Sequence, residues 1–599
     1  MIPNTIARMF VDTCDRYAGR TDKAVYARKV AGSWQTLTHD VLRERVEAFA
    51  LGLLACGIVP GERLGIVSEN RVEWAVADFA AACSGIIDVP VFPTLTAAQM
   101  AEVFGDCEAA AIVVSNKLQL SKILSVREAL PALRLVVVMN DDVELAQGCL
   151  RFADVEERGR ASADAHTRAV QLRAMADRIA PDELLTLIYT SGTTGTPKGV
   201  MLTHGNVTSN IAGALDAIPM SDSDVLLSYL PLCHSYERMA GYYLAFGVGA
   251  STWFAESIET VADNLAEVRP TVMTSVPRLF ERIRNRVLGA AAKAPAPRRA
   301  IFDWAMRIGQ KHHVNPTPLT RAQVKIADVL VYSKIRQRTG GRLRFFVSGG
   351  AALSVDVGSF FFMVGLPILE GYGLTETSPV LAVNRVGDET LGTVGPPLPN
   401  VELRIANDGE ILARGPNVMK GYWKRPQDTA DMIGPDGWLH TGDIGRFDGH
   451  GRLIITDRKK HLLVSSTGKN IAPQPIEQLL TQSSLIEQAM LVGNNREYCT
   501  ALVVLDAEAV KGALSADGVA VGDVVGSDAV HKRVWADIVR LQKDLSKYER
   551  VRRFTILREP FTVENGLMTP TLKVRRKAVE TRYAAEIEAM YSGPDTDTA

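Results

Sequence analysis

A string rich in glycine and threonine, SGTTGTPKG from Ser191 to Gly199, follows the apolar run Leu184 to Ile188. Glycine has no Cβ and permits positive φ, so the backbone N–H groups of such a loop can converge on an anion. The hydroxyl side chains add hydrogen-bond donors, and Lys198 adds a positive charge. The string therefore predicts a polyphosphate cradle at the end of a strand.

This loop is not the P-loop of nucleoside triphosphatases, because Gly199 follows Lys198 where that motif requires Ser or Thr. A fully specified string of nine residues arises by chance on the order of once in ten billion positions. It resembles the phosphate-binding signature of the adenylate-forming enzymes, which include acyl-CoA synthetases, luciferases and peptide-synthetase adenylation domains. The resemblance implies ATP-binding roles for Thr190, Ser191, Gly192, Thr193, Thr194, Gly195 and Lys198. It also implies a catalytic role for Thr194 and a Mg²⁺-binding role for Thr190.

The composition describes a soluble globular protein. A chain of 599 residues is expected to form several domains, and a net charge of −1 predicts no binding of nucleic acid. The seven cysteines are scattered and include no C-x-x-C pair, which argues against a disulfide framework or a zinc site and favours a cytoplasmic location. We expect no secretory signal and no transmembrane helix. Peripheral contact with the inner face of the membrane and a homodimer are both left open.

Short Val/Ile/Leu runs alternate with helical patterns along the first third of the chain, which predicts a layered α/β fold with parallel strands. The expected strands are Leu64 to Val67, Asp88 to Val91, Ala111 to Val114 and Leu135 to Val138. The region Pro295 to Arg338 is basic and helical in pattern. From Leu391 onward, short strands at Val401 to Ile405 and Glu410 to Ala413 predict a small β-rich subdomain.

By resemblance to the adenylate-forming enzymes, the chain is expected to divide into two domains. The large N-terminal domain, residues 1–457, would bind AMP and the acyl group, residues 458–460 would form a hinge, and residues 461–599 would form a small mobile α+β domain. Together these parts correspond to an acyl-CoA synthetase-like fold.

A second motif, EGYGLTET from Glu370 to Thr377, combines an aromatic ring between glycines with a hard carboxylate oxygen donor suited to Mg²⁺. By resemblance to the family, Tyr372 stacks on adenine and Glu376 binds magnesium and takes part in catalysis. The string SGGA, Ser348 to Ala351, matches the other adenine wall. The nucleotide-binding residues implied by these two strings are Gly349, Gly350, Ala351, Gly371, Tyr372, Gly373 and Thr375.

Two further strings match the family at the domain junction. An aspartate can accept hydrogen bonds from both hydroxyls of a ribose, which the family assigns to the Asp of its TGD string, here Asp443. In DRKK, Asp457 to Lys460, the resemblance places Arg458 on the ribose or phosphate and makes Lys460 the hinge residue. Lys459 is interpreted as part of a solvated turn.

The C-terminal string NGLMTPTLKVRRK, Asn565 to Lys577, matches the family's C-terminal catalytic motif. The resemblance implies that Lys573 bridges the substrate carboxylate and the α-phosphate. A cation is needed there because attack by a carboxylate on phosphorus brings two anions together. In HLLVSSTGKN, His461 to Asn470, the resemblance predicts a hairpin that lines the pantetheine channel, with Gly468 allowing close approach to coenzyme A.

The acyl site is expected around LPLCHSYER, Leu230 to Arg238, where the resemblance assigns His234 to orienting the carboxylate. Peptide-synthetase adenylation domains generally carry an Asp soon after this point, which meets the amino group of an amino acid. Here no acidic residue follows until Glu237, so the resemblance disfavours an amino acid substrate. The wider string resembles the long-chain fatty-acyl-CoA synthetases over nearly the whole chain. A fatty acid needs an apolar tunnel, whose walls are predicted at Tyr242, Tyr243 and Phe246. Phe360, Phe361 and Phe362 are interpreted as helix core.

These motifs predict an ATP-dependent long-chain fatty acid:CoA ligase with ATP, Mg²⁺ and coenzyme A as co-substrates. The first step would form acyl-AMP and pyrophosphate, and the second would transfer the acyl group to the thiol of coenzyme A. Two alternatives remain: a fatty-acyl-AMP ligase that delivers to a carrier protein, and a noncatalytic binding protein on the same fold. The second is disfavoured by the joint presence of Lys573, Glu376, Asp443 and Arg458.

Overall fold

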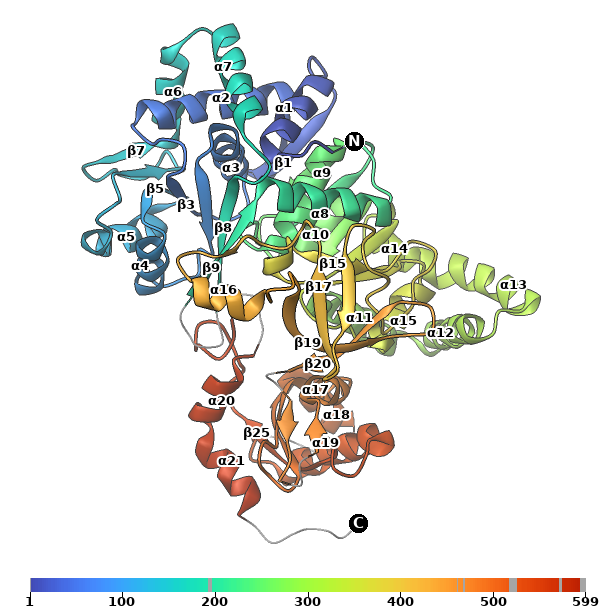
Figure 1. Ribbon diagram of the computed structural model, residues 1–599. Coiled ribbons are helices and arrows are strands. Elements are labelled where there is room, and N and C mark those ends of the chain that lie inside the picture. The colour runs from blue at the N-terminus through green and yellow to red at the C-terminus, as the bar shows by residue number, and fades with distance from the viewer. Residues whose placement is uncertain are drawn as a thin grey trace. The chain divides into compact units, whose positions relative to one another are not determined.

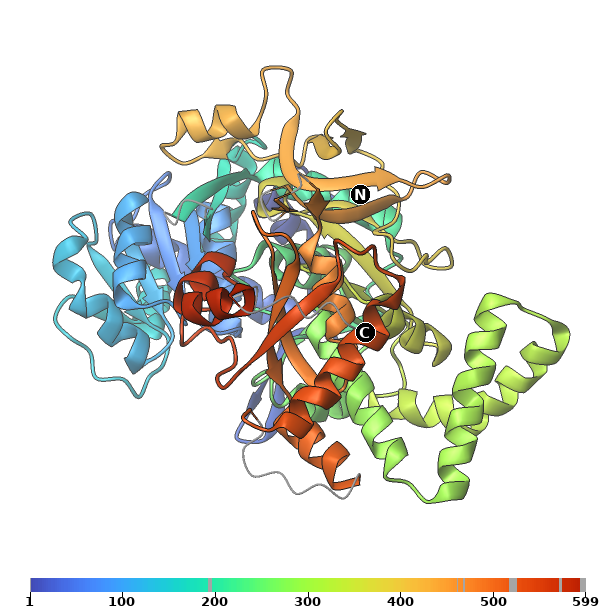
Figure 2. The same ribbon diagram turned by 90° about the horizontal axis from the view of Figure 1, so that it is seen from below.

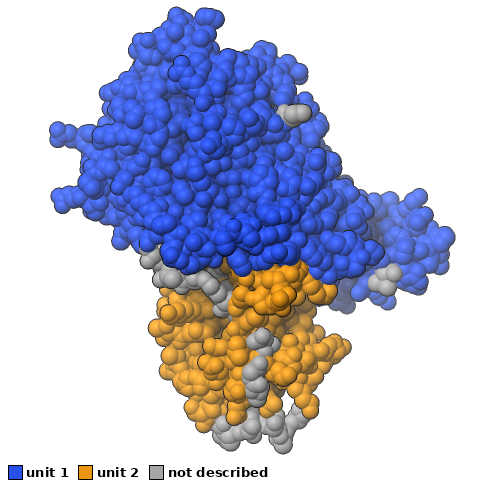
Figure 3. Space-filling view, in the orientation of Figure 1, with its two compact units in different colours: residues 1–404, 412–441, 447–454 blue, residues 405–411, 442–446, 455–599 orange. Residues whose placement is uncertain are grey.

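The computed structural model describes residues 2–191, 197–459, 462–466, 469–516, 525–569 and 574–592. The chain forms two compact units (Figure 3). Unit 1 contains residues 1–404, 412–441 and 447–454, and unit 2 contains residues 405–411, 442–446 and 455–599.

The first sheet of unit 1 has eight strands. Its strands in spatial order are β18 (Gly421–Tyr422), β9 (Pro197–Thr203), β8 (Leu184–Ser191), β4 (Ile87–Val91), β3 (Arg63–Val67), β5 (Ala109–Val114), β6 (Leu135–Val138) and β7 (Cys149–Arg151). The strands from β8 to β7 are parallel, whereas β9 is antiparallel to β8 and β18 is antiparallel to β9. The four strands expected from the apolar runs are confirmed as β3 to β6.

Helices of unit 1 lie around this sheet, either on its faces or packed on the helices that cover it (Figure 1). They are α1 (Ile6–Arg16), α2 (His39–Ala55), α3 (Val72–Ser84), α4 (Ala97–Asp106), α5 (Lys117–Ser125), η1 (Arg127–Ala129), α6 (Phe152–Ser162), α7 (Ala165–Arg178) and α8 (His204–Ala217). Two glycines allow α2 and α6 to pack backbone against backbone. A Cβ at Gly159 would lie 1.8 Å from the carbonyl oxygen of Ala48, and one at Gly52 would lie 2.0 Å from that of Val155.

The second sheet of unit 1 also has eight strands. They are β15 (Val380–Val383), β14 (Ile368–Gly373), β13 (Phe345–Ser348), β12 (Val272–Ser275), β10 (Val225–Ser228), β11 (Ser251–Phe254), β1 (Ala24–Val30) and β2 (Ser33–Thr38). The strands from β14 to β1 are parallel, and β15 and β2 are antiparallel additions at the two edges. The chain segments that connect these strands contain η2 (Glu237–Tyr243), α9 (Leu244–Val248), α10 (Val261–Val268), α15 (Val355–Met363) and η4 (Thr375–Thr377).

The basic region expected to be helical is confirmed as a helical insert between β12 and β13. It comprises α11 (Pro277–Ala292), α12 (Ala296–Val314), α13 (Pro318–Ala327), η3 (Asp328–Tyr332) and α14 (Ser333–Arg338). In both ribbon views α12 and α13 extend away from the sheets of unit 1 (Figure 1 and Figure 2). Behind the insert, Phe360 and Phe361 of α15 are buried as expected, whereas Phe362 is 37% exposed.

The β-rich segment is also confirmed. Strands β16 (Glu402–Ile405), β17 (Glu410–Arg414), β19 (Leu439–Phe447) and β20 (Leu453–Arg458) form a four-stranded sheet in that order, and α16 (Pro426–Met432) lies between β18 and β19 in the chain. The boundary between the two units passes through this sheet, since residues 405–411 and 442–446 belong to unit 2.

The remainder of unit 2 is an α+β structure. It contains the antiparallel pair β21 (Leu463–Val464) and β22 (Asn470–Ile471), and a sheet of β23 (Ile486–Val492), β24 (Cys499–Leu505) and β25 (Val551–Leu557). Its helices are α17 (Pro473–Leu480), α18 (Ala507–Ala516), α19 (Asp528–Leu541), η5 (Gln542–Asp544), α20 (Arg576–Arg582) and α21 (Ala584–Tyr591). The predicted fold class, a large α/β part followed by a small α+β part, is confirmed.

Two expectations from composition can be compared with the described residues. All seven cysteines are free thiols, and six of them are buried. Among the described helices, none is long and apolar enough to span a bilayer.

Candidate active site

The predicted phosphate loop joins two paired strands. Strand β8 is antiparallel to β9, with Thr190 opposite Lys198 and Ser191 opposite Pro197. Thr190 is half-buried at the end of β8. Gly192, Thr193, Thr194 and Gly195 lie outside the described residues, so their roles stay predictions.

Lys198 is held on β9 by a neighbouring carboxylate and ring. Its Nζ lies 2.5 Å from Oδ1 of Asp428 on α16 and 5.3 Å from the centre of the Tyr422 ring. Tyr422 is positioned by β18, which pairs with β9 through Val200. The ammonium is therefore fixed beside the end of the hairpin rather than extended into solvent.

Glu376 shares this edge of the first sheet. The hydroxyl of Tyr422 donates to its Oε1 over 2.7 Å, and the N–H of Met419 donates to its carbonyl oxygen over 2.8 Å. The structure thus brings together Lys198 and Glu376, which both come from separate predicted motifs, through Tyr422. Sequence reasoning missed Tyr422, because nothing in its local string marks it. Burial raises the pKa of Tyr422, and the nearby charge of Glu376 raises it further. The hydroxyl therefore keeps its proton and remains a hydrogen-bond donor.

The two predicted adenine walls lie at the ends of neighbouring parallel strands, β13 and β14. A Cβ at Gly349 would lie 3.0 Å from the ring of Tyr236, so the missing side chain lets this ring pack against the loop. Gly350 has a φ of +82° and is exposed, as is Ala351. The hydroxyl of Tyr236 donates to the carbonyl of Val347 over 2.9 Å.

The EGYG segment pairs with β15. Gly371 lies opposite Val383, Tyr372 lies opposite Ala382, and a Cβ at Gly373 would overlap the carbonyl oxygen of Pro379 at 1.7 Å. Tyr372 is half-buried. The geometry explains why glycine is needed at 373, while the stacking role of Tyr372 stays a prediction.

The loop of His234 meets the Glu376 segment. The hydroxyls of Ser235 and Thr375 share a hydrogen bond of 3.2 Å. The half-buried ring of His234 accepts a hydrogen bond at Nδ1 from the N–H of Tyr236 over 3.3 Å, which places the proton of a neutral ring on Nε2. The structure therefore brings the predicted carboxylate-orienting residue close to the predicted nucleotide-binding segment.

A buried carboxyl group directly after this loop was missed by the sequence reasoning. Glu237 begins the π-helix η2 and is fully buried. Its Oε2 accepts from the hydroxyl of Thr274 over 2.6 Å, and a Cβ at Gly241 would lie 2.2 Å from its Oε1. Burial raises the pKa of Glu237 to about 7.

This carboxyl group makes stability depend on pH. Its pKa is raised from 4.5 to about 7 in the folded protein. Between these two pH values the folded protein therefore binds more protons than the unfolded chain, and it loses stability as pH rises from 4.5 through 7. Glu237→Gln cannot ionise. Between pH 5 and pH 8 we expect the free energy of unfolding of this variant to rise relative to wild type by up to about 3 kcal/mol, at roughly 1.4 kcal/mol per pKa unit. Urea titrations at several pH values measure the difference.

Glu157→Gln is the matched control, because the side chain of Glu157 is 72% exposed. Its pH profile should follow that of the wild type. Parallel profiles for Glu237→Gln and the wild type would contradict a carboxyl group held neutral by burial.

The residues predicted to line the acyl tunnel belong to the core of unit 1. Tyr242, Tyr243 and Phe246 are at most 1% exposed. The hydroxyls of Tyr242 and Tyr243 donate to the carboxylate of Asp78 over 3.0 and 2.9 Å, and Phe246 packs against Phe79 with ring centres 4.6 Å apart. These contacts account for the three aromatic rings as packing residues, and their role in a tunnel stays a prediction.

Arg238 lies at the centre of this polar cluster. Its guanidinium forms ion pairs with Asp78 and Asp88, the latter at 2.7 Å, and donates to Thr186 over 2.8 Å. The side chains of all three charged residues are at most 2% exposed. Burial raises the pKa of Asp78 to about 7 against the opposing effect of Arg238. The ion pairs hold η2, and with it the His234 loop, against α3 and β4.

Unit 2 contains the predicted ribose contact. Asp443 on β19 is buried, and its Oδ1 lies 2.9 Å from Nε of Arg458 on the neighbouring strand β20. The structure therefore brings these two predicted residues together. Lys459 forms ion pairs with Asp408 at 2.6 Å and Glu410 at 3.0 Å, so it is paired rather than simply solvated.

Three predicted residues of unit 2 lie outside the described residues, namely Lys460, Gly468 and Lys573. The strands β21 and β22 form the arms of the expected hairpin, with Leu463 opposite Ile471. The roles of these three residues stay predictions.

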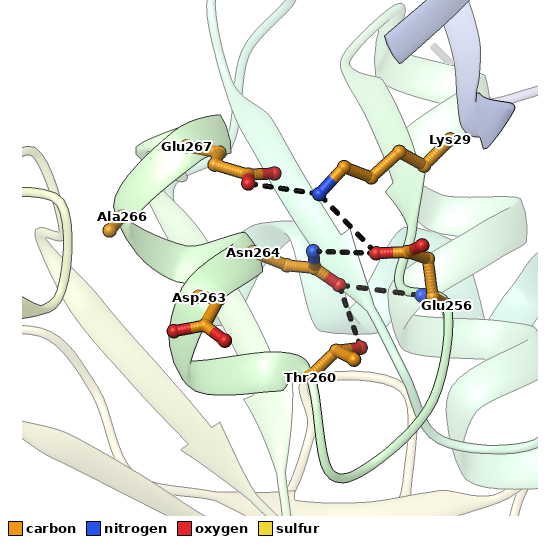
Figure 4. A pocket seen from close by; sticks show the side chains of 7 residues that line it. All are labelled: Lys29, Glu256, Thr260, Asp263, Asn264, Ala266 and Glu267. Carbon is orange, nitrogen blue, oxygen red and sulfur yellow. Dashed lines mark hydrogen bonds and ion pairs between the residues drawn. The ribbon is translucent and has the colours of Figure 1, made fainter. Parts of the chain in front are cut away.

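A surface pocket of about 540 Å³ lies apart from all predicted residues (Figure 4). Its polar groups pair with one another: Nζ of Lys29 lies 3.4 Å from Glu256 and 2.9 Å from Glu267, and the amide of Asn264 contacts Glu256. The charged groups that line the pocket already pair with one another, so we do not consider the pocket a candidate binding site.

The fold resembles solved structures of adenylating proteins. The anthranilate CoA ligase AuaEII in complex with anthranoyl-AMP aligns with a TM-score of 0.71 and 20% identity over 97% of this chain and 98% of that one. The A-PCP didomain of the carboxylic acid reductase of Segniliparus rugosus, in complex with AMP, aligns with a TM-score of 0.76 and 22% identity over 98% of this chain and 82% of that one. These likenesses establish the fold.

The sequence then identifies the family. The model of the AMP-binding enzyme family matches residues 14–423, and that of the AMP-binding enzyme C-terminal domain matches residues 460–595. The chain belongs to the AMP-binding enzyme family. It is 36% identical to the long-chain-fatty-acid–CoA ligase FadD15 of Mycobacterium bovis over 95% of both chains. It is 33% identical to the peroxisomal long chain acyl-CoA synthetase 7 of Arabidopsis thaliana over 98% of this chain and 86% of that protein.

Proposed function

We propose that this protein is an ATP-dependent long-chain fatty acid:CoA ligase. It forms acyl-AMP and pyrophosphate from a fatty acid and ATP, and then transfers the acyl group to coenzyme A. The observation that carries the proposal is the similarity to FadD15 over 95% of both chains, which includes the C-terminal domain. The arrangement of Lys198, Glu376 and Tyr422 at the end of the hairpin supports it.

The adenylation step needs donors for phosphate and a partner for ribose. The hairpin between β8 and β9 would present the backbone and hydroxyl donors of Ser191 to Thr196 to the phosphates, with Lys198 supplying charge. Asp443 would accept the ribose hydroxyls, and its ion pair with Arg458 orients the carboxylate. His234 would orient the acyl carboxylate, and Lys573 would bridge that carboxylate and the α-phosphate.

The residues present fit a magnesium ion. Mg²⁺ in nucleotide sites is commonly bound by one or two carboxylates together with substrate phosphates, so a cluster of three acidic ligands is not required. Glu376 offers a carboxylate fixed by Tyr422, and Thr190 offers a hydroxyl at the end of β8. When bound, the ion would offset negative charge on the phosphates. We propose Glu376 and Thr190 as its ligands.

The second step calls for access by coenzyme A. We propose that residues 461–599 rotate about the hinge at residues 458–460, with Lys460 as the pivot. The hairpin that contains Gly468 would then line the pantetheine channel. Transfer to a thiol needs no cysteine of the protein as a nucleophile, since the acyl-adenylate is already activated.

We propose a cytoplasmic location, because a reducing compartment suits a chain with seven free thiols.

The proposal is tested with the purified protein, ATP, Mg²⁺ and palmitate, with and without coenzyme A. We expect pyrophosphate release and a palmitoyl thioester that depends on coenzyme A. Adenylate formation without any thioester would support the fatty-acyl-AMP ligase instead. The absence of adenylate over a panel of C8 to C24 acids would contradict both activities.

A further inference from the structure

The helical insert carries a large excess of positive charge in a chain that is nearly neutral overall. Residues 277–338 contain fourteen lysines and arginines and three acidic residues, a net charge of +11, whereas the whole chain has a net charge of −1. The rest of the chain is therefore acidic. Positive charge concentrated on a projecting element creates a local electrostatic field, which the net charge of the whole chain does not reveal (Figure 1 and Figure 2).

The same insert exposes large apolar side chains. Leu319 is 67% exposed, Ile326 is 53% exposed and Val329 is 70% exposed, and Leu330 is exposed as well. Positions 319, 326 and 330 differ by seven and four residues, so on α13 and η3 they share one helical face. Much of the apolar surface of these side chains is therefore left uncovered by the core of unit 1.

Two cations lie on the same helix, both to one side of this apolar face. Arg321 and Lys325 are exposed on α13, and among the described residues no acidic side chain forms an ion pair with either of them. A partner that satisfies the surface must therefore combine negative charge with an apolar layer. Nucleic acid supplies only the first of these, because its outer surface is phosphate and sugar.

We propose that α13 and η3 dock the protein on the surface of a bilayer that contains anionic lipid. Cations bind the anionic headgroups, while Leu319, Ile326 and Val329 enter the boundary between headgroups and acyl chains. This inference goes beyond the proposed function and does not depend on it.

The test is cosedimentation of the full chain, without ATP, with vesicles of phosphatidylcholine alone or with 30% phosphatidylglycerol. We expect binding to the anionic vesicles that weakens as salt is raised from 50 to 300 mM. The double variant Arg321→Glu/Lys325→Glu should reduce the bound fraction at least tenfold at low salt. The triple variant Leu319→Ser/Ile326→Ser/Val329→Ser should reduce it severalfold and leave binding more sensitive to salt.

The pair Lys117→Glu/Leu118→Ser is the matched control, because both residues are exposed on α5, outside the insert. It should bind vesicles as the wild type does. Circular dichroism verifies that each variant is folded. The proposal is overturned if the wild type ignores anionic vesicles, if the insert variants bind as the wild type does, or if the control pair loses as much binding. Binding to RNA or to an acidic protein without vesicle binding would also overturn it.

Discussion

Arg238→Met is expected to lower the free energy of unfolding of unit 1 by about 3 to 5 kcal/mol. The methionine keeps an apolar stem but removes the cation between Asp78 and Asp88, and leaving buried charges without a partner costs about this much. It also removes the donors to Thr186 and Tyr243. Urea unfolding followed by fluorescence measures the loss.

The loss should grow with pH. Without the guanidinium, the buried Asp78, whose pKa burial already raises, can relieve its repulsion from Asp88 by binding a proton, and this becomes harder as pH rises from 5 to 8. Arg238→Lys should be less destabilising than Arg238→Met, because it keeps the positive charge. It should still be less stable than the wild type, because an ammonium group lacks the planar fork with which the guanidinium reaches both carboxylates. If Arg238→Met and Arg238→Lys lower the free energy of unfolding equally at pH 5 and at pH 8, packing and not charge holds this cluster together.

Arg20→Met is the control within the same unit. Arg20 and Asp22 form an ion pair at 2.9 Å, with 56% and 70% of their side chains exposed. Exposed pairs contribute little to stability, so its unfolding midpoint should match the wild type. A comparable shift in this variant would mean that any loss of an arginine destabilises the unit.

Glu376→Gln is expected to slow adenylation by roughly 100- to 1,000-fold. A bound metal ion stabilises the charge of the transition state by several kcal/mol, and each 1.4 kcal/mol is tenfold in rate. Glutamine has nearly the same shape but no charge, so the effect separates metal binding from packing. Pyrophosphate release measured over a Mg²⁺ titration should show a higher Mg²⁺ requirement as well as a lower rate.

Tyr422→Phe is the matched control for this variant. It removes the hydroxyl that donates to Glu376 over 2.7 Å and keeps the ring beside Lys198. We expect a loss of less than tenfold, with the Mg²⁺ requirement nearly unchanged. Equal losses in both variants would assign Glu376 a positioning role through Tyr422 instead of a role as a metal ligand.

Much of the fold could be predicted from local patterns. Buried parallel strands read as continuous Val/Ile/Leu runs, so Leu64–Val67 and Ala111–Val114 identified β3 and β5 within a few residues. The helical pattern of the basic region was equally clear. In contrast, strand order and the eight-stranded size of each sheet come from pairings between distant segments, which a single sequence does not display.

The candidate site was predicted in part. Asp443 and Arg458 were both selected from motifs, and the ion pair between them follows from the neighbouring strands β19 and β20. Tyr422 and Glu237 were missed because each gains its role from a partner elsewhere in the chain. The expectation for Tyr242 and Tyr243 considered only their apolar rings, whereas their hydroxyls bind the buried Asp78.

The SGTTGTPKG string and the motifs that follow it determined the family, the reaction class and most of the candidate site residues. They could do so because a loop that binds phosphate through its own backbone needs glycine and hydroxyl residues at consecutive positions. Only the tertiary structure decided how Lys198 and Glu376 meet through Tyr422, and how Arg238 is neutralised by carboxylates 150 and 160 residues away. Burial and charge pairing depend on neighbours in space, and those neighbours exist only once the chain has folded.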